Sequence, residues 1–76
     1  MAVTQIYTWQ ERLRDETKEL AERLNKLQDY MRTPAFYNLP RADKDLLYSQ
    51  YHAMLSYLQI LGQRCELHSI MLYDKA

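Results

Sequence analysis

Glycine and proline are scarce in this chain, and their positions constrain its fold more than any other feature. The 76 residues include one glycine, Gly62, and two prolines, Pro34 and Pro40. β-Turns depend on these residue types, so the chain has little material for sheets built from hairpins. Both prolines fall in one short stretch and disfavour helical geometry at the residue before each. The sequence therefore predicts an all-α protein, an antiparallel two-helix hairpin with a short proline-bounded connector.

The segment before the break, residues 8–31, has the pattern of an amphipathic helix. Its apolar side chains recur every three or four residues and therefore share one stripe: Leu13, Leu20, Leu24, Leu27 and Met31. The other faces are dense in opposite charges spaced four residues apart, which stabilise an exposed helix surface. We expect one helix from about residue 8 to about residue 31, with a solvated outer face.

The connector, residues 32–39, contains the apolar side chains of Phe36, Tyr37 and Leu39. This composition is too apolar for a loose linker, and we expect the three side chains to fold back over the end of the hairpin. Pro40 suits the first turn of the next helix, where its missing N–H costs nothing. The second helix is expected from about residue 40 to about residue 73.

The second helix is apolar over much more of its surface than the first. Residues 46–63 contain no charged side chain, although serine, glutamine and histidine interrupt the segment and make it unsuitable as a membrane span. One apolar stripe includes Leu47 and Leu61, and an adjoining stripe includes Leu46, Ile60 and Leu67. A single partner helix covers only about a third of a helix surface. The sequence therefore predicts an oligomeric helical bundle with these interface residues: Leu47, Met54, Leu55, Leu58, Leu61, Leu67 and Met71.

Length and cysteine usage fit this interpretation. A chain of 76 residues forms one domain at most, here residues 1–76, and a domain this small needs an additional source of stability. Cys65 is the single cysteine, which excludes a disulfide within the chain and suits a reducing compartment. The amino-terminal residues lack the pattern of a signal peptide. We predict a cytoplasmic protein that does not bind membranes.

Ten basic and ten acidic residues give a net charge of zero. Proteins that bind long nucleic acids have a basic excess on one face, so we do not expect that class of partner. Phosphate loops, nucleophile elbows and helix-borne zinc motifs are missing too, and we predict a protein that is not an enzyme and needs no cofactor. Cys65 and His68 have the spacing of a metal pair, but their place on the apolar stripe favours packing roles, and no metal site is predicted.

Aromatic and cationic side chains supply candidate ligand-binding residues. The chain has seven tyrosines, and an amphipathic role at an interface is one interpretation of them. The other interpretation is stacking on a base. Arg64 is the only cation between Lys44 and Lys75, so it either pairs with a nearby carboxylate or binds an anion. The candidate ligand-binding set is Arg64, Tyr57, Tyr51, Tyr37, Arg41 and Gln50.

The order of residues also resembles a known family. The matching positions are Leu20, Arg23, Leu24 and Leu27, then Phe36 and Leu39, then Leu46, Leu47, Gln50, Met54, Tyr57, Ile60, Leu61 and Arg64. Across about residues 9–66 this spacing resembles small phage and prophage proteins related to a crAss-like phage protein. The resemblance implies a helical hairpin of phage origin, which would act inside an infected bacterial host cell. Small oligomeric phage proteins include the anti-CBASS and anti-Thoeris sponges, so the extension to nucleotide signals is an analogy.

Two functions follow from these observations. The first is a homo-oligomeric sponge that sequesters a nucleotide immune signal, either a cyclic nucleotide or an ADP-ribose derivative, at subunit boundaries without catalysis. In it, Tyr37, Tyr51 and Tyr57 stack on bases while Arg41 and Arg64 bind phosphate. The alternative is a helical interaction protein that binds a host or phage protein through its apolar second helix.

Overall fold

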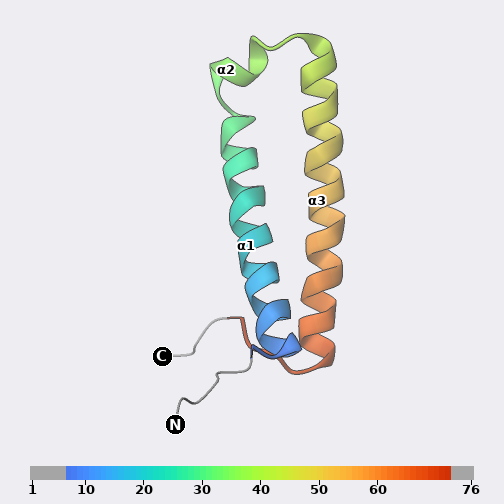
Figure 1. Cartoon of the computed structure of the whole chain (residues 1–76). Coiled ribbons are helices and arrows are strands. Elements are labelled where there is room, and N and C mark those ends of the chain that lie inside the picture. Colours follow the sequence, from blue (N-terminus) through green and yellow to red (C-terminus); the bar gives the residue numbers. More distant parts are fainter. Residues whose placement is uncertain (1–6, 73–76) are drawn as a thin grey trace.

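The computed structural model describes residues 7–72, which form three helices. Helix α1 spans Trp9–Tyr30, the short α2 spans Pro34–Tyr37, and α3 spans Arg41–Leu67. The two long helices lie antiparallel, side by side, and α2 lies at the turn between them (Figure 1). The start of α1 therefore lies beside the end of α3. The predicted all-α fold with packed helices is confirmed, and assembly into an oligomer stays a prediction.

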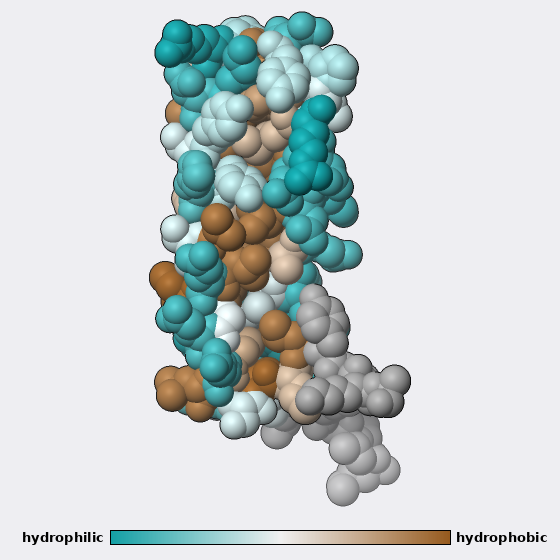
Figure 2. Space-filling view, turned by 180° about the vertical axis from the view of Figure 1, so that it is seen from behind, coloured by the Kyte–Doolittle hydropathy of each residue, from teal (hydrophilic) through white to brown (hydrophobic). Residues whose placement is uncertain are grey.

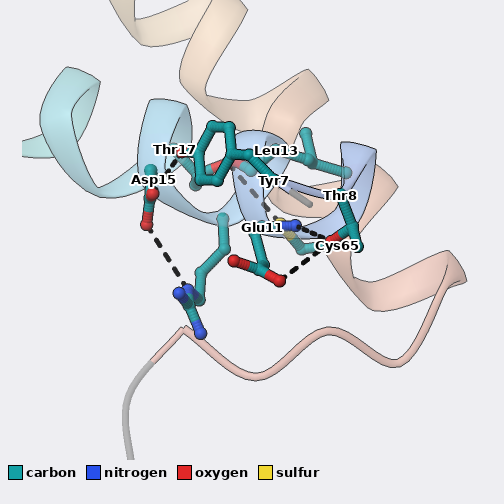
Figure 3. A network of polar contacts seen from close by, with 8 residues as sticks. Tyr7, Thr8, Glu11, Leu13, Asp15, Thr17 and Cys65 are labelled. Carbon is teal, nitrogen blue, oxygen red and sulfur yellow. Dashed lines mark hydrogen bonds and ion pairs between the residues drawn. The ribbon is translucent and has the colours of Figure 1, made fainter. Parts of the chain in front are cut away.

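Thr8 determines where α1 begins. Its side chain accepts a hydrogen bond of 3.1 Å from the backbone N–H of Glu11, and its hydroxyl donates to the Glu11 carboxylate at 3.3 Å (Figure 3). This arrangement is close to a capping box, and it satisfies one of the N–H groups that the first turn of a helix leaves without a partner. The sequence Thr-x-x-Glu before the apolar stripe thus fixes the start of α1.

Thr8→Ala is expected to lower the free energy of unfolding by about 1 kcal/mol, the usual loss at a threonine cap. Thr8→Ser keeps the accepting oxygen and serves as the control, with a loss of a few tenths of a kcal/mol at most. Urea unfolding monitored by far-UV circular dichroism measures both. Equal losses for the two variants would show that the hydrogen bond at Thr8 is not the stabilising interaction.

The connector contains α2 and closes one end of the hairpin. Thr33 caps α2, because its side-chain oxygen accepts from the Phe36 N–H at 3.4 Å, and Pro34 occupies the first turn. Phe36 is 0% exposed, and its ring meets those of Tyr30 and Tyr48 edge to face, with centroids 6.1 and 5.4 Å apart. The expected burial of Phe36 is confirmed. Two other connector side chains differ: Leu39 is half-buried, and Tyr37 is 63% exposed.

Helix α3 ends at Leu67, six residues before the expected end at Tyr73, which lies outside the described residues. Ser69 adopts a left-handed backbone with φ of 55°, and the Ile70 N–H donates to the Cys65 carbonyl at 2.8 Å. This is the geometry of a helix C-terminal turn, and it reverses the chain. Ile70 and Leu72 consequently pack against the hydrophobic core instead of extending α3.

The core is narrow. In residues 7–72 the buried apolar side chains are Leu13, Leu20, Leu24, Phe36, Leu61 and Cys65. Thr17 is buried among them, and its hydroxyl donates to the Leu13 carbonyl at 2.7 Å and lies 3.5 Å from the Cys65 sulfur (Figure 3). A hydroxyl that bonds the carbonyl four residues earlier needs no other partner, so Thr17 is tolerated in the core.

Much of α3 stays exposed. The stripe with Leu61 and Cys65 packs on α1, while large apolar side chains of the adjoining stripe stay exposed, among them Leu46, Ile60 and Leu67. Apolar side chains gather along the middle and lower part of the face in Figure 2, while hydrophilic ones cover the upper part of α1. In the described part of the chain, no helix combines the length and the apolarity that crossing a membrane requires.

Candidate functional site

A surface hollow of about 280 Å³ lies where the start of α1 meets the end of α3. Its lining residues are Trp9, Arg12, Leu13, Glu16 and Arg64, and we call it the Arg64 hollow. Four of the five come from the first two turns of α1, and the antiparallel packing of α3 supplies Arg64. Leu13 is a buried core residue and forms its apolar part. The hollow therefore combines two guanidinium groups, one carboxylate and one indole.

Arg64 is available to an anion in this hollow. It is exposed, and it forms no ion pair with a carboxylate of residues 7–72. Of the two alternatives for Arg64, pairing with a nearby carboxylate is therefore not what the structure shows. A guanidinium presents a planar fork of donors that matches phosphate or carboxylate oxygens in two places. Arg12 on the neighbouring helix adds a second cation to the same hollow.

Tyr57 links the two helices beside the hollow. Its hydroxyl donates a hydrogen bond to the Glu16 carboxylate. That bond raises the pKa of Tyr57 above its ordinary value, and the positive charge of Arg64 acts in the opposite direction. Of the predicted ligand-binding set, Arg64 therefore lines the hollow, and Tyr57 contacts Glu16, another residue of its lining.

Trp9, which lines the hollow, also belongs to an aromatic pair. The rings of Trp9 and His68 meet edge to face with centroids 4.8 Å apart. His68 is the residue at which α3 ends, so the contact joins the first turn of α1 to the turn after α3. Trp9 is 44% exposed, which leaves part of the indole surface open to a ring stacked on it.

A second hollow of about 310 Å³ lies at the connector end. It is lined by Phe36, Tyr37, Arg41, Lys44, Asp45 and Tyr48, and we call it the connector hollow. Its cations have partners within the chain: Arg41 pairs with Asp45 at 3.8 Å, and the Lys44 ammonium donates to the Tyr37 carbonyl at 3.4 Å. These contacts make the connector hollow a weaker candidate for an anion site than the Arg64 hollow.

The structure divides the predicted ligand-binding set between the two ends of the hairpin. Tyr37 and Arg41 line the connector hollow, while Tyr57 and Arg64 lie at the other end. The helical rise along α3 separates Arg41 from Arg64 by about 35 Å, so one chain cannot bring both to the same phosphate. Tyr51 is half-buried with its ring against His52, and Gln50 is exposed.

Sequence reasoning missed Trp9, Arg12 and Glu16. They are three and four residues apart, which puts them on one face of α1, and that periodicity was visible in the sequence. Their pairing with Arg64 was not visible, because it depends on how far each helix extends past the connector. The antiparallel register brings residue 12 beside residue 64.

The residues of the predicted oligomer interface differ in how exposed they are in the single chain. Leu61 is 1% exposed and packs inside the hairpin, so its side chain is not available to a second copy. Met54 and Leu58 pack against the same core, and Leu47 and Leu55 are half-buried. The exposed members of the predicted interface are Leu67 and Met71.

Cys65 and His68 have separate partners. The Cys65 sulfur contacts Thr17 in the core, and the His68 ring packs on Trp9. Among residues 7–72, no three histidine, cysteine, aspartate or glutamate side chains gather as a metal would require.

Comparison with known proteins assigns a family. The family model described as Sequestin matches residues 7–67, most of the chain and all three helices. The chain belongs to the Sequestin family. The family's name denotes sequestration of a ligand or partner, and the match includes the Arg64 hollow. No curated protein matches the chain, and no solved structure does.

Proposed function

We propose that this Sequestin protein is a phage-encoded binding protein that sequesters a nucleotide immune signal in the cytoplasm of the infected bacterium, without catalysis. The observation that carries the proposal is the Arg64 hollow, where Arg64 forms no ion pair within residues 7–72 and lies beside Arg12 and a partly exposed indole. Membership of the Sequestin family supports a sequestering role.

The chemistry of the hollow suits a phosphorylated nucleotide. The forked donors of Arg64 bind two oxygens of one phosphate, and Arg12 offers a second cation for a neighbouring phosphate. Trp9 provides a ring on which a base stacks, a contact worth about 1–3 kcal/mol. Glu16, held by Tyr57, lies at the edge of the hollow where it accepts hydrogen bonds from ribose hydroxyls or base amines. Cyclic dinucleotides and ADP-ribose derivatives have all of these groups.

Thermal unfolding with a panel of cyclic dinucleotides and cyclic ADP-ribose isomers tests the proposal. A ligand present at 100 times its dissociation constant stabilises the folded state by about 2.7 kcal/mol. For a domain of this size that raises the melting temperature by roughly 10–20 °C. We expect Arg64→Ala to abolish the shift and Arg64→Lys to restore little of it, because an ammonium lacks the planar fork.

Arg32→Ala is the matched control. Arg32 is an exposed arginine between α1 and α2, far from the Arg64 hollow, and its replacement should leave the shift intact. Mass spectrometry of the ligand released by denaturation should return it chemically unchanged. A shift that survives in Arg64→Ala, or a cleaved ligand, would contradict the proposal.

The exposed apolar face of α3 favours a second candidate function, in which the protein binds a host or phage protein. Leu46, Ile60 and Leu67 are all more than half exposed. This function predicts no thermal shift with any nucleotide, together with retention of a specific host protein that Leu67→Glu abolishes.

A further inference from the structure

Four side chains of α3 form an exposed row with a spacing of seven residues. They are Leu46, Ala53, Ile60 and Leu67, and we call this row the α3 seam. Leu46, Ile60 and Leu67 are 69%, 55% and 77% exposed. A seven-residue repeat keeps one line of side chains facing a partner helix along its whole length. Within the described residues the seam has no such partner, because α1 packs on the stripe that contains Leu61 and Cys65.

A polar row runs parallel to the seam. Gln50, Tyr57 and Arg64 also have a spacing of seven residues, and each lies four residues after a member of the seam. This row lies between the seam and α1, since the Tyr57 hydroxyl reaches Glu16 and Arg64 lines the hollow with α1 residues. A helix that covered the seam would therefore reach the edge of the Arg64 hollow.

The seam has a two-fold symmetry in its spacing. If a second α3 runs antiparallel with its midpoint near residue 57, Leu46 faces Leu67 of the second copy and Ala53 faces Ile60. Each pairing occurs twice, and the small Ala53 side chain leaves room for the larger Ile60. The same register places Gln50 opposite Arg64 and Tyr57 opposite its own counterpart. A two-fold interface requires this self-complementarity.

Charge favours the antiparallel orientation over the parallel one. Between Asp45 and Glu66, Arg64 is the single charged side chain of α3. In a parallel pair the two Arg64 side chains would lie side by side and repel each other. In the antiparallel pair they are about 21 Å apart along the helix, and each faces a neutral glutamine. A separation that exceeds the Debye length of about 8 Å leaves little repulsion.

We propose that a second copy of this chain packs antiparallel on the α3 seam and completes the ligand site with its Gln50 and Tyr57. The inference rests on the proposed function for the identity of the ligand. The Arg64 hollow of one chain has a volume of about 280 Å³, at the lower limit of about 300–1,000 Å³ for sites that enclose a small ligand. The second copy closes the open side of the hollow. Its Gln50 amide donates to a phosphate that Arg64 of the first copy binds, and its Tyr57 ring enlarges the surface on which a base stacks.

Disulfide trapping tests the orientation without any ligand. Leu46→Cys and Leu67→Cys replace exposed side chains, and the native Cys65 thiol is only 2% exposed, so it stays unreactive. A disulfide needs Cα atoms within about 7 Å of each other. We expect an equimolar mixture of the two variants to form the mixed disulfide dimer under mild oxidation, at least tenfold more than either variant alone. Self-linked dimers of each variant, or no linkage in the mixture, would overturn the antiparallel seam.

Mixing two inactive variants tests whether the site is shared. In an Arg64→Ala homodimer both sites lack the guanidinium, and in a Gln50→Glu homodimer both have a carboxylate facing Arg64. A mixed dimer has one site with neither change, so random pairing restores about a quarter of the sites. We expect a mixture of the two chains to bind a cyclic ADP-ribose isomer that neither binds alone, measured by equilibrium dialysis. Failure to restore binding, with both variants dimeric and the parent active, would overturn the shared site.

The two proposals fail in distinguishable ways. If the parent protein binds no nucleotide but the mixed disulfide forms, the proposed function is wrong and the antiparallel dimer stands. If the parent binds nucleotide and mixing restores nothing, the site belongs to one chain and the completion by a second copy is wrong.

Discussion

Leu61→Glu is expected to unfold the hairpin completely at 25 °C. Leu61 is 1% exposed and lies in the core cluster with Leu13 and Cys65, so the new carboxylate would be buried away from water among apolar side chains. A buried charge without a partner costs about 3–5 kcal/mol, and the lost packing adds to that. A domain this small has only about 5 kcal/mol of stability. Loss of the 222 nm circular dichroism signal measures the effect.

Leu67→Glu is the matched control on the same helix. Leu67 is 77% exposed in the hairpin, so a carboxylate there stays hydrated and α3 should keep its helicity. If a second copy packs on the α3 seam, this variant should be a folded monomer by light scattering at micromolar concentration while the parent is a dimer. A folded Leu61→Glu protein would show that the stripe packed against α1 has been assigned wrongly.

Leu61 is buried and Leu67 is exposed, although both are leucines on the apolar helix α3. The sequence of α3 alone does not distinguish them. The absence of charge from residues 46–63 predicted that several faces of this helix are apolar. It did not indicate which stripe packs on α1, because leucine is the commonest residue of both stripes and each also has a methionine and a tyrosine. That choice depends on the angle at which the connector delivers α3 to α1, and this angle is a property of the tertiary fold.

Sequence motifs explain where α1 and α2 begin, but they do not explain where α3 ends. Thr8 with Glu11, and Thr33 with Pro34, are capping patterns that can be recognised in the sequence, and α1 and α2 begin there. The end of α3 depends on a left-handed Ser69, a conformation that serine adopts only when the surroundings stabilise it. Here Ile70 and Leu72 gain contacts with the core when the chain reverses, and this tertiary gain ended the helix earlier than its periodicity indicated.

The candidate site could be predicted only in part, because its residues come from two helices whose packing the sequence does not specify. Arg64 stood out because it is the single cation of a long neutral segment, and the structure places it in a hollow. Tyr37 and Arg41 have the residue types of such a site, but they line the connector hollow at the other end of the hairpin. Trp9 and Arg12 needed the antiparallel register of the two helices before they could be assigned to the same site.

Phe36→Ala is expected to lower the free energy of unfolding by about 3 kcal/mol, the usual loss for a buried aromatic residue. Phe36 is 0% exposed, and its ring contacts the rings of Tyr30, Tyr37 and Tyr48, so the truncation leaves a cavity surrounded by three aromatic side chains. For a domain of this size the melting temperature should fall by roughly 12–24 °C. Differential scanning calorimetry measures it.

Tyr37→Ala tests whether that loss comes from burial. Tyr37 is the neighbour of Phe36 in α2 but is 63% exposed, so its truncation removes one edge contact and little buried area. We expect a loss of about 0.5–1 kcal/mol, within the range of one aromatic pair. Because Phe36 joins α2 to both long helices through Tyr30 and Tyr48, its loss should also loosen the angle between α1 and α3. A melting temperature for Phe36→Ala within two degrees of the parent would mean that α2 does not hold the hairpin closed, and the register that brings Arg12 to Arg64 would then depend on the α1–α3 packing alone.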